Sequence, residues 1–226
     1  MPITSNNFDF LNTLKQNNNR DWFNENKQWY LKNHEETIAF ADEVLSLMNQ
    51  HDNIETPNGK KSLFRIYKDT RFSKDKTPYK THWGGYLRRA TNALRGGYYF
   101  HIEPGNSFVG GGFWGPNADD LKRIREEIAI DSTDLREILA DKNFAATFKE
   151  LKGEQLKTAP KGFPKDHPDI DLLRYKQFIV SKSFTDKEVL SNDFYETVNT
   201  TFKQLRPFFD YMSEVLTTDA NGVSII

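Results

Sequence analysis

The sequence predicts an α+β protein in which an antiparallel sheet packs against N-terminal and C-terminal helices. Apolar residues follow helical spacing toward both ends of the chain, whereas they alternate with polar residues in the middle, where glycine and proline mark tight turns. We expect about 4–6 strands, roughly from residues 62–113 plus 176–184. Since 226 residues suffice to bury a core and no linker interrupts the pattern, we expect a single globular domain over residues 1–226.

Composition narrows the class of protein. Hydrophobic residues make up 37% of the chain and the net charge is −1, which indicates a folded protein rather than a disordered tail or a basic nucleic-acid coat. The chain has no cysteine, which excludes disulfides, thiolate metal ligands and cysteine nucleophiles. The first residues lack the pattern of a signal peptide, and no apolar run approaches the roughly 20 residues that cross a bilayer. We therefore expect a cytoplasmic protein with no membrane partner.

Residues 6–50 are expected to be helical. Ile38, Ala41 and Leu45 recur at the spacing that places them on one helical face, and an asparagine-rich break precedes this pattern. Four aromatic residues after the break are interpreted as core rather than as a ligand platform, because aromatic burial dominates core energetics. They are Trp22, Phe23, Trp29 and Tyr30.

The run TPNGKKS resembles the end of a phosphate-binding P-loop but does not match it. Ile54 stands where the first glycine of that motif belongs, and Lys61 stands where the motif has serine or threonine. We interpret the run as a turn that leads into a strand over residues 62–68. In this strand the odd-numbered side chains, from Leu63 to Tyr67, would share one face and the even-numbered ones the other.

A loop over residues 69–80 is expected to join this strand to a second strand near residues 81–89. A hairpin that turns at residues 104–106 should follow. Along its first strand, Tyr98, Phe100 and Ile102 alternate with Tyr99, His101 and Glu103. The first three form the expected core face, and the second three would face a cleft.

Gly110, Gly112 and Gly115 match the dinucleotide-binding spacing G-x-G-x-x-G, but their context argues against that function. A dinucleotide fold needs a parallel strand after the following helix, whereas more helix is expected there. Asp119 and Asp120 would also occupy the first turn of that helix and repel a phosphate. We interpret the glycines as a bulge, or as positions where another backbone or a ligand approaches closely.

The C-terminal half is expected to return to helices, beginning with Asn117 as an N-cap. A proline-rich connection leads to a further strand near residues 176–184, and Thr185 begins a predicted capping box after it. A final helical stretch over about residues 192–217 should be broken or kinked at Pro207, which lacks a backbone donor.

Charge is distributed unevenly along the chain. Residues 60–95 carry eleven Lys or Arg against Asp69 and Asp75, a local charge of +9, while the rest of the chain carries −10. Such asymmetry indicates a local attraction for anions in a protein that otherwise repels them. The densest part, residues 65–89, is therefore the expected working surface.

The expected ligand is a small anion that carries a phosphate or a carboxylate. Arg71 can hold such a group through two parallel hydrogen bonds, and neighbouring lysines add charge. Asp69, Asp75 and His101 are the acid or base candidates if catalysis occurs. An exposed loop with solvated lysines is the alternative interpretation. The candidate ligand-binding residues are Arg65, Lys68, Arg71, Lys76, Tyr79, Lys80 and Tyr99.

No metal site is predicted. His101 and Glu103 share a strand face, and His82 or His167 could join them as metal ligands, but no tight ligand cluster is visible. The G-x-S-x-G elbow of serine hydrolases and the H-E-x-x-H zinc motif are both absent. The sequence thus assigns neither an enzyme class nor a cofactor.

A second hypothesis is a non-enzymatic module that binds nucleic acid or an acidic protein through the same basic stripe. Tyr79, Trp83 and Tyr86 would be its stacking groups. The charge of −10 carried elsewhere and a pI near 6.5 disfavour it. Steeply salt-dependent binding to oligonucleotides would support it. We prefer the first hypothesis, because neutral proteins with a compact basic site more often hold small anions.

The run RIYKDTRFSKDKTPYKTH, together with WFNENKQWY and SFVGGGFWGP, resembles domain-of-unknown-function family 2461, a group of conserved bacterial proteins. The resemblance spans nearly the whole chain, from about Phe8 to Phe209, and YKDTRFSKDKTPYK is its most specific part. It implies no activity, cofactor or partner. It does imply that seven residues fall on the family signature: Arg65, Asp69, Arg71, Asp75, Lys76, Tyr79 and Lys80.

Overall fold

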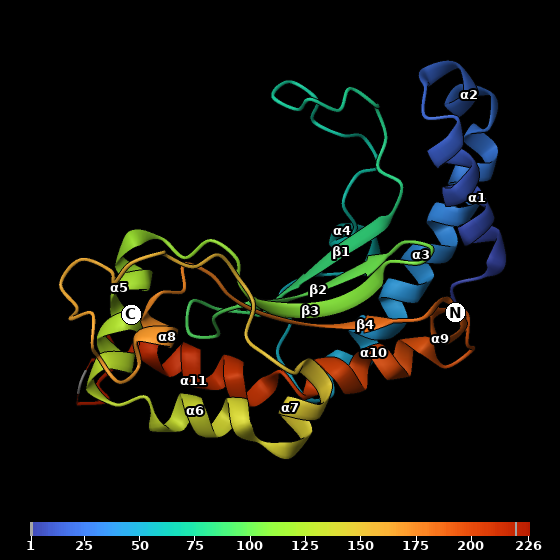
Figure 1. The fold of residues 1–226 in the computed structure, drawn as a ribbon. Coiled ribbons are helices and arrows are strands. Elements are labelled where there is room, and N and C mark those ends of the chain that lie inside the picture. Colours follow the sequence, from blue (N-terminus) through green and yellow to red (C-terminus); the bar gives the residue numbers. More distant parts are fainter. Residues whose placement is uncertain (1, 220) are drawn as a thin grey trace. The chain divides into compact units, whose positions relative to one another are not determined.

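The structure, a computed structural model, describes residues 2–219 and 221–226 and confirms the α+β class (Figure 1). Its described part contains a four-stranded antiparallel sheet in the order β1-β2-β3-β4, so neighbours in sequence are neighbours in the sheet. The strands are β1 (Trp83–Arg88), β2 (Gly97–Ile102), β3 (Ser107–Phe113) and β4 (Phe178–Phe184). None of the described helices combines the length and apolar character that a bilayer-spanning segment needs.

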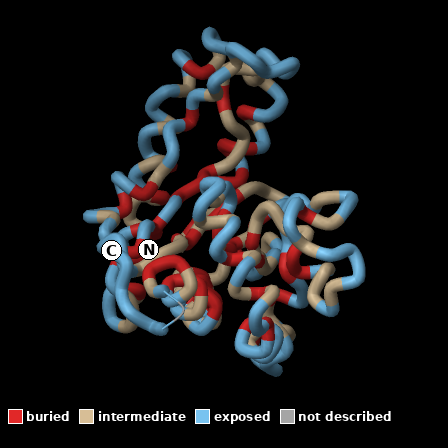
Figure 2. Tube along the Cα trace, turned by 90° about the vertical axis from the view of Figure 1, so that its left-hand side faces the viewer, coloured by how far each residue is buried: buried red, intermediate tan, exposed pale blue. Residues whose placement is uncertain are grey.

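Contacts within the chain group it into two compact units, and every strand contributes residues to both. Unit 1 comprises Met1–Leu87, Tyr99–Val109 and Ser183–Thr200. Unit 2 comprises Arg88–Tyr98, Gly110–Lys182 and Thr201–Ile226. Buried residues recur along helices and strands, whereas many connecting segments are exposed (Figure 2). The single domain expected from the sequence stays a prediction.

The N-terminal helices of unit 1 confirm the helical prediction for residues 6–50. They are α1 (Ser5–Gln16), α2 (Arg20–Glu25) and α3 (Lys27–Met48). Asn19, in the asparagine-rich break, starts α2 by accepting a hydrogen bond of 2.9 Å from the amide of Trp22. Phe10 packs edge-on against Trp29 at 5.4 Å and stacks on Trp83 at 5.9 Å. Of the four aromatic residues predicted as core, Phe23 is buried, whereas Trp22, Trp29 and Tyr30 are half-buried and pack around Phe10 or Phe23.

The hairpin β2–β3 also follows the prediction. Its turn contains Gly105 at φ +75°, a left-handed conformation that favours glycine. Tyr98, Phe100 and Ile102 are fully buried, which confirms them as the core face of β2. Within unit 1, Phe100 packs edge-on against Phe40 at 5.6 Å. The helices α9 (Asp186–Val189) and α10 (Phe194–Lys203) follow β4, and α9 starts with the predicted capping box.

The strand expected over residues 62–68 is wrong. The helical turn α4 (Gly59–Ser62) comes first, and the following residues pair at two isolated bridges, Leu63 with Gly85 and Tyr67 with Tyr79. The physical reason is a change of partner: the segment first pairs with β1 and then with the returning arm of the loop. That arm contains Pro78, which has no amide to donate, so no continuous ladder forms.

The helices of unit 2 confirm the return to helical structure that the sequence predicts after Asn117. They are α5 (Ala118–Ile130), α6 (Thr133–Ala140), α7 (Lys142–Phe148), α8 (Ile170–Leu173) and α11 (Arg206–Thr217). Asn117 caps α5 as predicted, and Asp141 ends the preceding run because its carboxylate accepts the first amides of α7. The C-terminal break precedes Pro207, which lies in the first turn of α11.

Arg89 lies in the core of unit 2 and not on the basic working surface expected from the sequence. Its side chain is inaccessible to solvent. It donates hydrogen bonds to the carboxylate of Asp210 at 2.5 Å and to the hydroxyl of Ser213 at 3.3 Å. Its guanidinium also lies 5.5 Å from the ring centre of Phe209. The positive charge of Arg89 is therefore paired with Asp210 within unit 2.

The first two glycines of the G-x-G-x-x-G run, Gly110 and Gly112, confirm the interpretation of a close backbone approach. A Cβ at Gly110 would collide with the carbonyl oxygen of Val180, and a Cβ at Gly112 would collide with that of Phe178. Gly112 also has φ +138°, which disfavours any other residue. The glycines thus let β4 pack beside β3.

We predict that Gly112→Ala lowers the free energy of unfolding by about 2–4 kcal/mol, through backbone strain and the clash with Phe178. Gly115→Ala is the matched control, because nothing lies within 4 Å of a Cβ at that position. It should change stability by less than about 0.5 kcal/mol. Urea unfolding of both variants provides the measurement, and equal stabilities would contradict the packing account.

Candidate functional site

The basic loop of unit 1 is held against the connection between α1 and α2. The side-chain amide of Asn18 donates to the carbonyl oxygen of Tyr79 at 2.9 Å, and the amide of Tyr79 donates back to Asn18 Oδ1 at 3.1 Å. The ring of Tyr79 is buried and stacks on Phe23 with ring centres 4.0 Å apart. The returning arm of the loop is therefore fixed to the helices by polar and aromatic contacts together.

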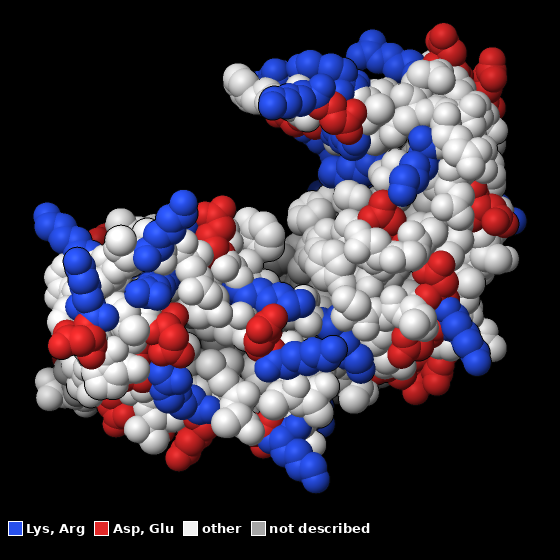
Figure 3. All heavy atoms as spheres, viewed as in Figure 1, with Lys and Arg blue, Asp and Glu red and all other residues white. Residues whose placement is uncertain are grey.

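Two adjoining hollows lie where the loop meets the helices, and both are lined by Arg20, Thr70 and Pro78. One has a volume of about 650 Å³ and is also lined by Lys74, Asp75, Lys76 and Thr77. The other has a volume of about 330 Å³ and is also lined by Tyr67, Lys68 and Tyr79. We call them together the loop groove. Figure 3 shows Lys and Arg side chains gathered over this loop.

Hydrogen bonds within the loop use its two carboxylates. Asp69 accepts from Arg71 Nε at 3.0 Å and from its Nη2 at 2.6 Å. Asp75 accepts from Lys68 Nζ at 2.8 Å and from the amide of Thr77 at 2.9 Å. The hydrogen bonds from Arg71 lower the pKa of Asp69 below its ordinary value. The pKa of Asp75 is also lowered, mainly by the hydrogen bond from Lys68 and then by those from Thr77. Both carboxylates therefore act as structural acceptors in this structure.

Other cations of the loop groove have no such acid among the described residues. Lys76 Nζ donates to the carbonyl oxygen of Thr70 at 2.8 Å, and no carboxylate in the described part of the chain pairs with its charge. Arg20 and Lys74 are exposed, and within the described residues no carboxylate lies at ion-pair distance from either. These cations are the groups that can hold an anion.

The structure brings together some of the predicted ligand-binding residues and separates others. Lys68, Lys76 and Tyr79 line the loop groove, as does the acid candidate Asp75. Arg71 lies on the exposed part of the loop, where Asp69 occupies its guanidinium fork. The predicted residues that do not line the groove are Arg65, Asp69, Arg71, Lys80, Tyr99 and His101.

Lys80 and Arg65 form a separate contact beside β1. Lys80 Nζ donates to the carbonyl oxygen of Arg65 at 2.7 Å and lies 5.6 Å from the ring centre of Phe64. Burial, followed by the charge of Arg65, lowers the pKa of Lys80. Lys80 is therefore tied to the backbone outside the groove.

Arg20 lines both hollows, and the sequence reasoning missed it. It lies about fifty residues before the loop, so no local pattern connects it with the basic run. One available signal was its place in the asparagine-rich break, since breaks between helices are exposed. The contact of Asn18 with Tyr79 brings this break to the loop.

The predicted stacking groups of the nucleic-acid hypothesis differ in exposure. Tyr79 and Trp83 are each 3% exposed, and both rings pack in the aromatic core of unit 1. Tyr86 is 38% exposed. Two of the three rings are thus covered by protein and do not present a face to a base.

Tyr99, His101 and Glu103 make a second polar cluster, on the face of β2 opposite its core residues. We call it the β2 cluster. Tyr99 Oη lies 3.0 Å from His101 Nδ1, and His101 Nε2 lies 3.2 Å from Glu103 Oε2. The ring of His82 lies 4.1 Å from that of His101. Burial and then the neighbouring His101 lower the pKa of His82 to about 4. In the described residues no three His, Asp or Glu side chains are arranged to hold a metal ion.

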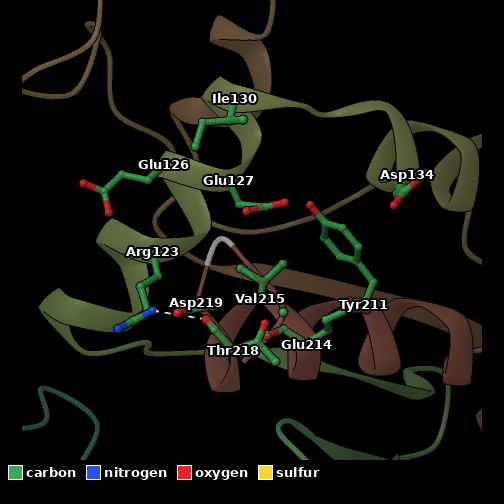
Figure 4. Close-up of a pocket in the computed structure, with 11 residues that line it drawn as sticks. Arg123, Glu126, Glu127, Ile130, Asp134, Tyr211, Glu214, Val215, Thr218 and Asp219 are labelled. Carbon is green, nitrogen blue, oxygen red and sulfur yellow. Dashed lines mark hydrogen bonds between the residues drawn. The ribbon is translucent and has the colours of Figure 1, made fainter. Parts of the chain in front are cut away.

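Unit 2 contains a pocket of about 300 Å³ with the opposite charge (Figure 4). Tyr211 points toward Glu127 within it, and burial together with the surrounding carboxylates raises the pKa of the Tyr211 phenol. Among the described residues of its lining, Arg123 is the one cation, against five acids. They are Glu126, Glu127, Asp134, Glu214 and Asp219. This pocket repels anions, which leaves the loop groove as the candidate site.

We predict that the His82 imidazole titrates near pH 4 and not near its ordinary value of 6.5. The folded pKa lies below the unfolded one, so the folded state binds fewer protons between these values. The stability contributed by neutral His82 is therefore present above pH 6.5 and is lost as the pH falls toward 4.

NMR titration of the imidazole measures the pKa of His82 directly. His82→Gln should lose less stability than the native chain between pH 7 and pH 4, because the variant lacks this group. A pKa of His82 near 6.5 would contradict the burial that the structure shows.

Comparison with protein-family models assigns the sequence that forms this site to a wider group. The family model described as "Conserved hypothetical protein (DUF2461)" matches residues 6–211, which include the loop groove, the β2 cluster and most of both units. Neither a search of curated proteins nor a search of solved structures gave a match. The matched range agrees with the resemblance carried by the loop signature, and the chain belongs to the DUF2461 family of conserved hypothetical proteins.

Proposed function

We propose that the protein binds a small anionic ligand, bearing a phosphate or a carboxylate, in the loop groove. The observation that carries this proposal is the convergence of Arg20, Lys74 and Lys76 on one hollow, with Arg20 and Lys74 free of carboxylate partners among the described residues. Lys68 lines the adjoining hollow. Its charge is already neutralised by an ion pair with Asp75. The groove therefore carries a positive charge in excess of its acids.

Electrostatic magnitudes favour a ligand with concentrated charge. A unit charge 4 Å from a cation at a protein surface gains roughly 4 kcal/mol before desolvation and entropy are counted. At 0.1 M salt, electrostatic interactions are screened over about 10 Å. The attractions of several cations around one hollow therefore add up only for a ligand that lies among them. Arginine adds paired hydrogen bonds to phosphate or carboxylate oxygens.

The groove is also organised before a ligand arrives. Asn18 and the stacking of Tyr79 on Phe23 hold the returning arm, and Lys76 Nζ closes the outgoing arm through Thr70. Fixing a loop in advance lowers the entropy lost on binding. Volumes of about 330 and 650 Å³ fall in the range of small-molecule sites. This supports a small ligand over a polyanion, as does the burial of Tyr79 and Trp83.

We predict that at least one class of small anion raises the melting temperature of the native chain. The compounds to screen are pyrophosphate, nucleotides, sugar phosphates and dicarboxylates. A ligand at one hundred times its Kd stabilises by about 2.7 kcal/mol, or roughly 5–10 °C for a chain of this size. Arg20→Ala should weaken binding at least roughly tenfold, since a hydrogen bond to a charged group contributes about 1.5–3 kcal/mol.

Lys161→Ala is the matched control, because Lys161 is an exposed lysine of unit 2 far in sequence from the groove. This control variant should respond to each ligand as the native chain does. Equal shifts in the native chain and Arg20→Ala would overturn the site, and so would the absence of any shift. A single-stranded oligonucleotide in the same screen tests the nucleic-acid alternative through its salt dependence.

A further inference from the structure

Three polar side chains at alternate positions of β2 form a continuous hydrogen-bonded chain. Tyr99, His101 and Glu103 share one strand face, and the chain runs from phenol to imidazole to carboxylate over distances of 3.0 and 3.2 Å. One tautomer satisfies both contacts: His101 carries its proton on Nε2 and donates it to Glu103, and its Nδ1 accepts the proton of the Tyr99 hydroxyl. A hydroxyl, an imidazole and a carboxylate in this order are the elements of a charge-stabilised nucleophile.

Neighbouring residues fix the orientation of His101 and Glu103 in this hydrogen-bonded series. The ring of His101 stacks on Phe108 with ring centres 4.8 Å apart, and the residue is 8% exposed. Glu103 accepts from Asn106 at 2.8 Å and from Thr81 at 3.2 Å, in addition to His101. These contacts hold the carboxylate and the imidazole in one orientation.

The protonation states match the same roles at neutral pH. Burial raises the pKa of Tyr99 to about 12, so its hydroxyl keeps its proton at rest. Burial lowers the pKa of His101, which leaves a neutral imidazole able to accept that proton. Burial acts in the opposite direction on Glu103, but hydrogen bonds from Asn106 and His101 hold the pKa of Glu103 below its ordinary value. The carboxylate is therefore ionised and can stabilise an imidazolium.

The positions beside the hydroxyl indicate the charge of a substrate. Gly84 lies against this hydroxyl, since a Cβ at that position would lie 3.1 Å from Tyr99 Oη, and residue 84 has no side chain to cover it. The ring of Phe64 packs 6.1 Å from that of Tyr99 and carries the ammonium of Lys80 at 5.6 Å. The charges of Lys80 and Lys68 also act on His82, whose ring adjoins that of His101, so the surroundings of this cluster favour an anionic group such as a phosphoryl.

We propose that Tyr99 is a nucleophile for phosphoryl groups, with His101 as its general base and Glu103 as the positioning residue of that base. Tyr99 Oη attacks phosphorus, the bond from oxygen to phosphorus forms, and the bond from phosphorus to the leaving group breaks. The phenol proton passes to His101 Nδ1 and then to the leaving group. This site lies outside the loop groove, so it stands or falls independently of the proposed function.

Diisopropyl fluorophosphate is a probe of this step that needs no knowledge of the substrate. Attack by Tyr99 joins the phenol oxygen to phosphorus and expels fluoride, and peptide mass spectrometry locates and times the adduct. We expect labelling of Tyr99 in the native chain and its loss in Tyr99→Phe. His101→Gln should slow labelling roughly 100-fold, the typical contribution of a general base. Glu103→Gln should slow it at least roughly tenfold, because the imidazole loses its orientation.

The pH profile separates activation from simple exposure. Groups that face His101 and shift this profile are His82, Tyr99 and Glu103, with Lys68 and Lys80 acting through His82. Labelling of Tyr99 should rise as His101 loses its proton below pH 6.5 and then level off. A free phenol would instead become about tenfold more reactive per pH unit until its pKa near 10.

Tyr67 serves as the internal control, because it is 52% exposed and lies outside this hydrogen-bonded chain. Its labelling should be unchanged in the His101 and Glu103 variants. Melting temperatures within a few degrees of the native value show that the variants are folded. Labelling of Tyr99 at the native rate in both variants, or no labelling of Tyr99 while Tyr67 reacts, would overturn the proposal.

Discussion

The reciprocal hydrogen bonds between Asn18 and the backbone of Tyr79 are the constraint on which the loop groove depends. A loop so rich in lysine would otherwise repel itself and extend into solvent. Two hydrogen bonds of about 1 kcal/mol each, and an aromatic pair of about 0.5–1.5 kcal/mol, are small beside the stability of a domain. They are sufficient to favour one arrangement of a surface loop, since local opening needs only a few kcal/mol.

This constraint explains why the basic residues differ in what they do. Lys68 and Arg71 neutralise the two carboxylates of the loop, and Lys80 is tied to the backbone beside β1. Arg89 is sealed in the core of unit 2. Arg20, from a distant part of the sequence, adds a cation that faces the groove. The charge of +9 in residues 60–95 is thus divided among structure, packing and a smaller set of cations that can bind.

The β2 cluster is built on a different principle. The loop groove depends on exposed positive charge, whereas the cluster depends on partial burial, which keeps Tyr99 protonated and His101 neutral. Strand alternation supplies the spacing, because residues two apart on β2 lie on the same face. Both features lie in unit 1, and the pocket of unit 2 carries the opposite charge.

Sequence reasoning predicted what depends on local periodicity and could not predict what depends on distant partners. The helices from α1 to α3, the core face of β2 and the capping box at Thr185 follow directly from spacing and local hydrogen bonding. The strand over residues 62–68 is wrong, because its alternation did not reveal that its pairing partner changes between Leu63, which pairs with Gly85, and Tyr67, which pairs with Tyr79. Arg20 and Asn18 were missed for the same reason: a contact across sixty residues leaves no local pattern.

We infer that Asn18 holds the loop in the shape in which it would bind an anion. Backbone amide signals in an NMR titration with pyrophosphate, recorded for the native chain and for Asn18→Ala, measure this effect. Asn12→Ala is the control, because Asn12 is an exposed asparagine of α1 that is not among the residues lining the groove. We expect saturable shifts at residues 18–20 and 68–79 in the native chain and the control, and binding at least roughly tenfold weaker in Asn18→Ala, since losing both bonds costs about 2 kcal/mol. Equal affinity in Asn18→Ala, or shifts that avoid these residues, would contradict the account.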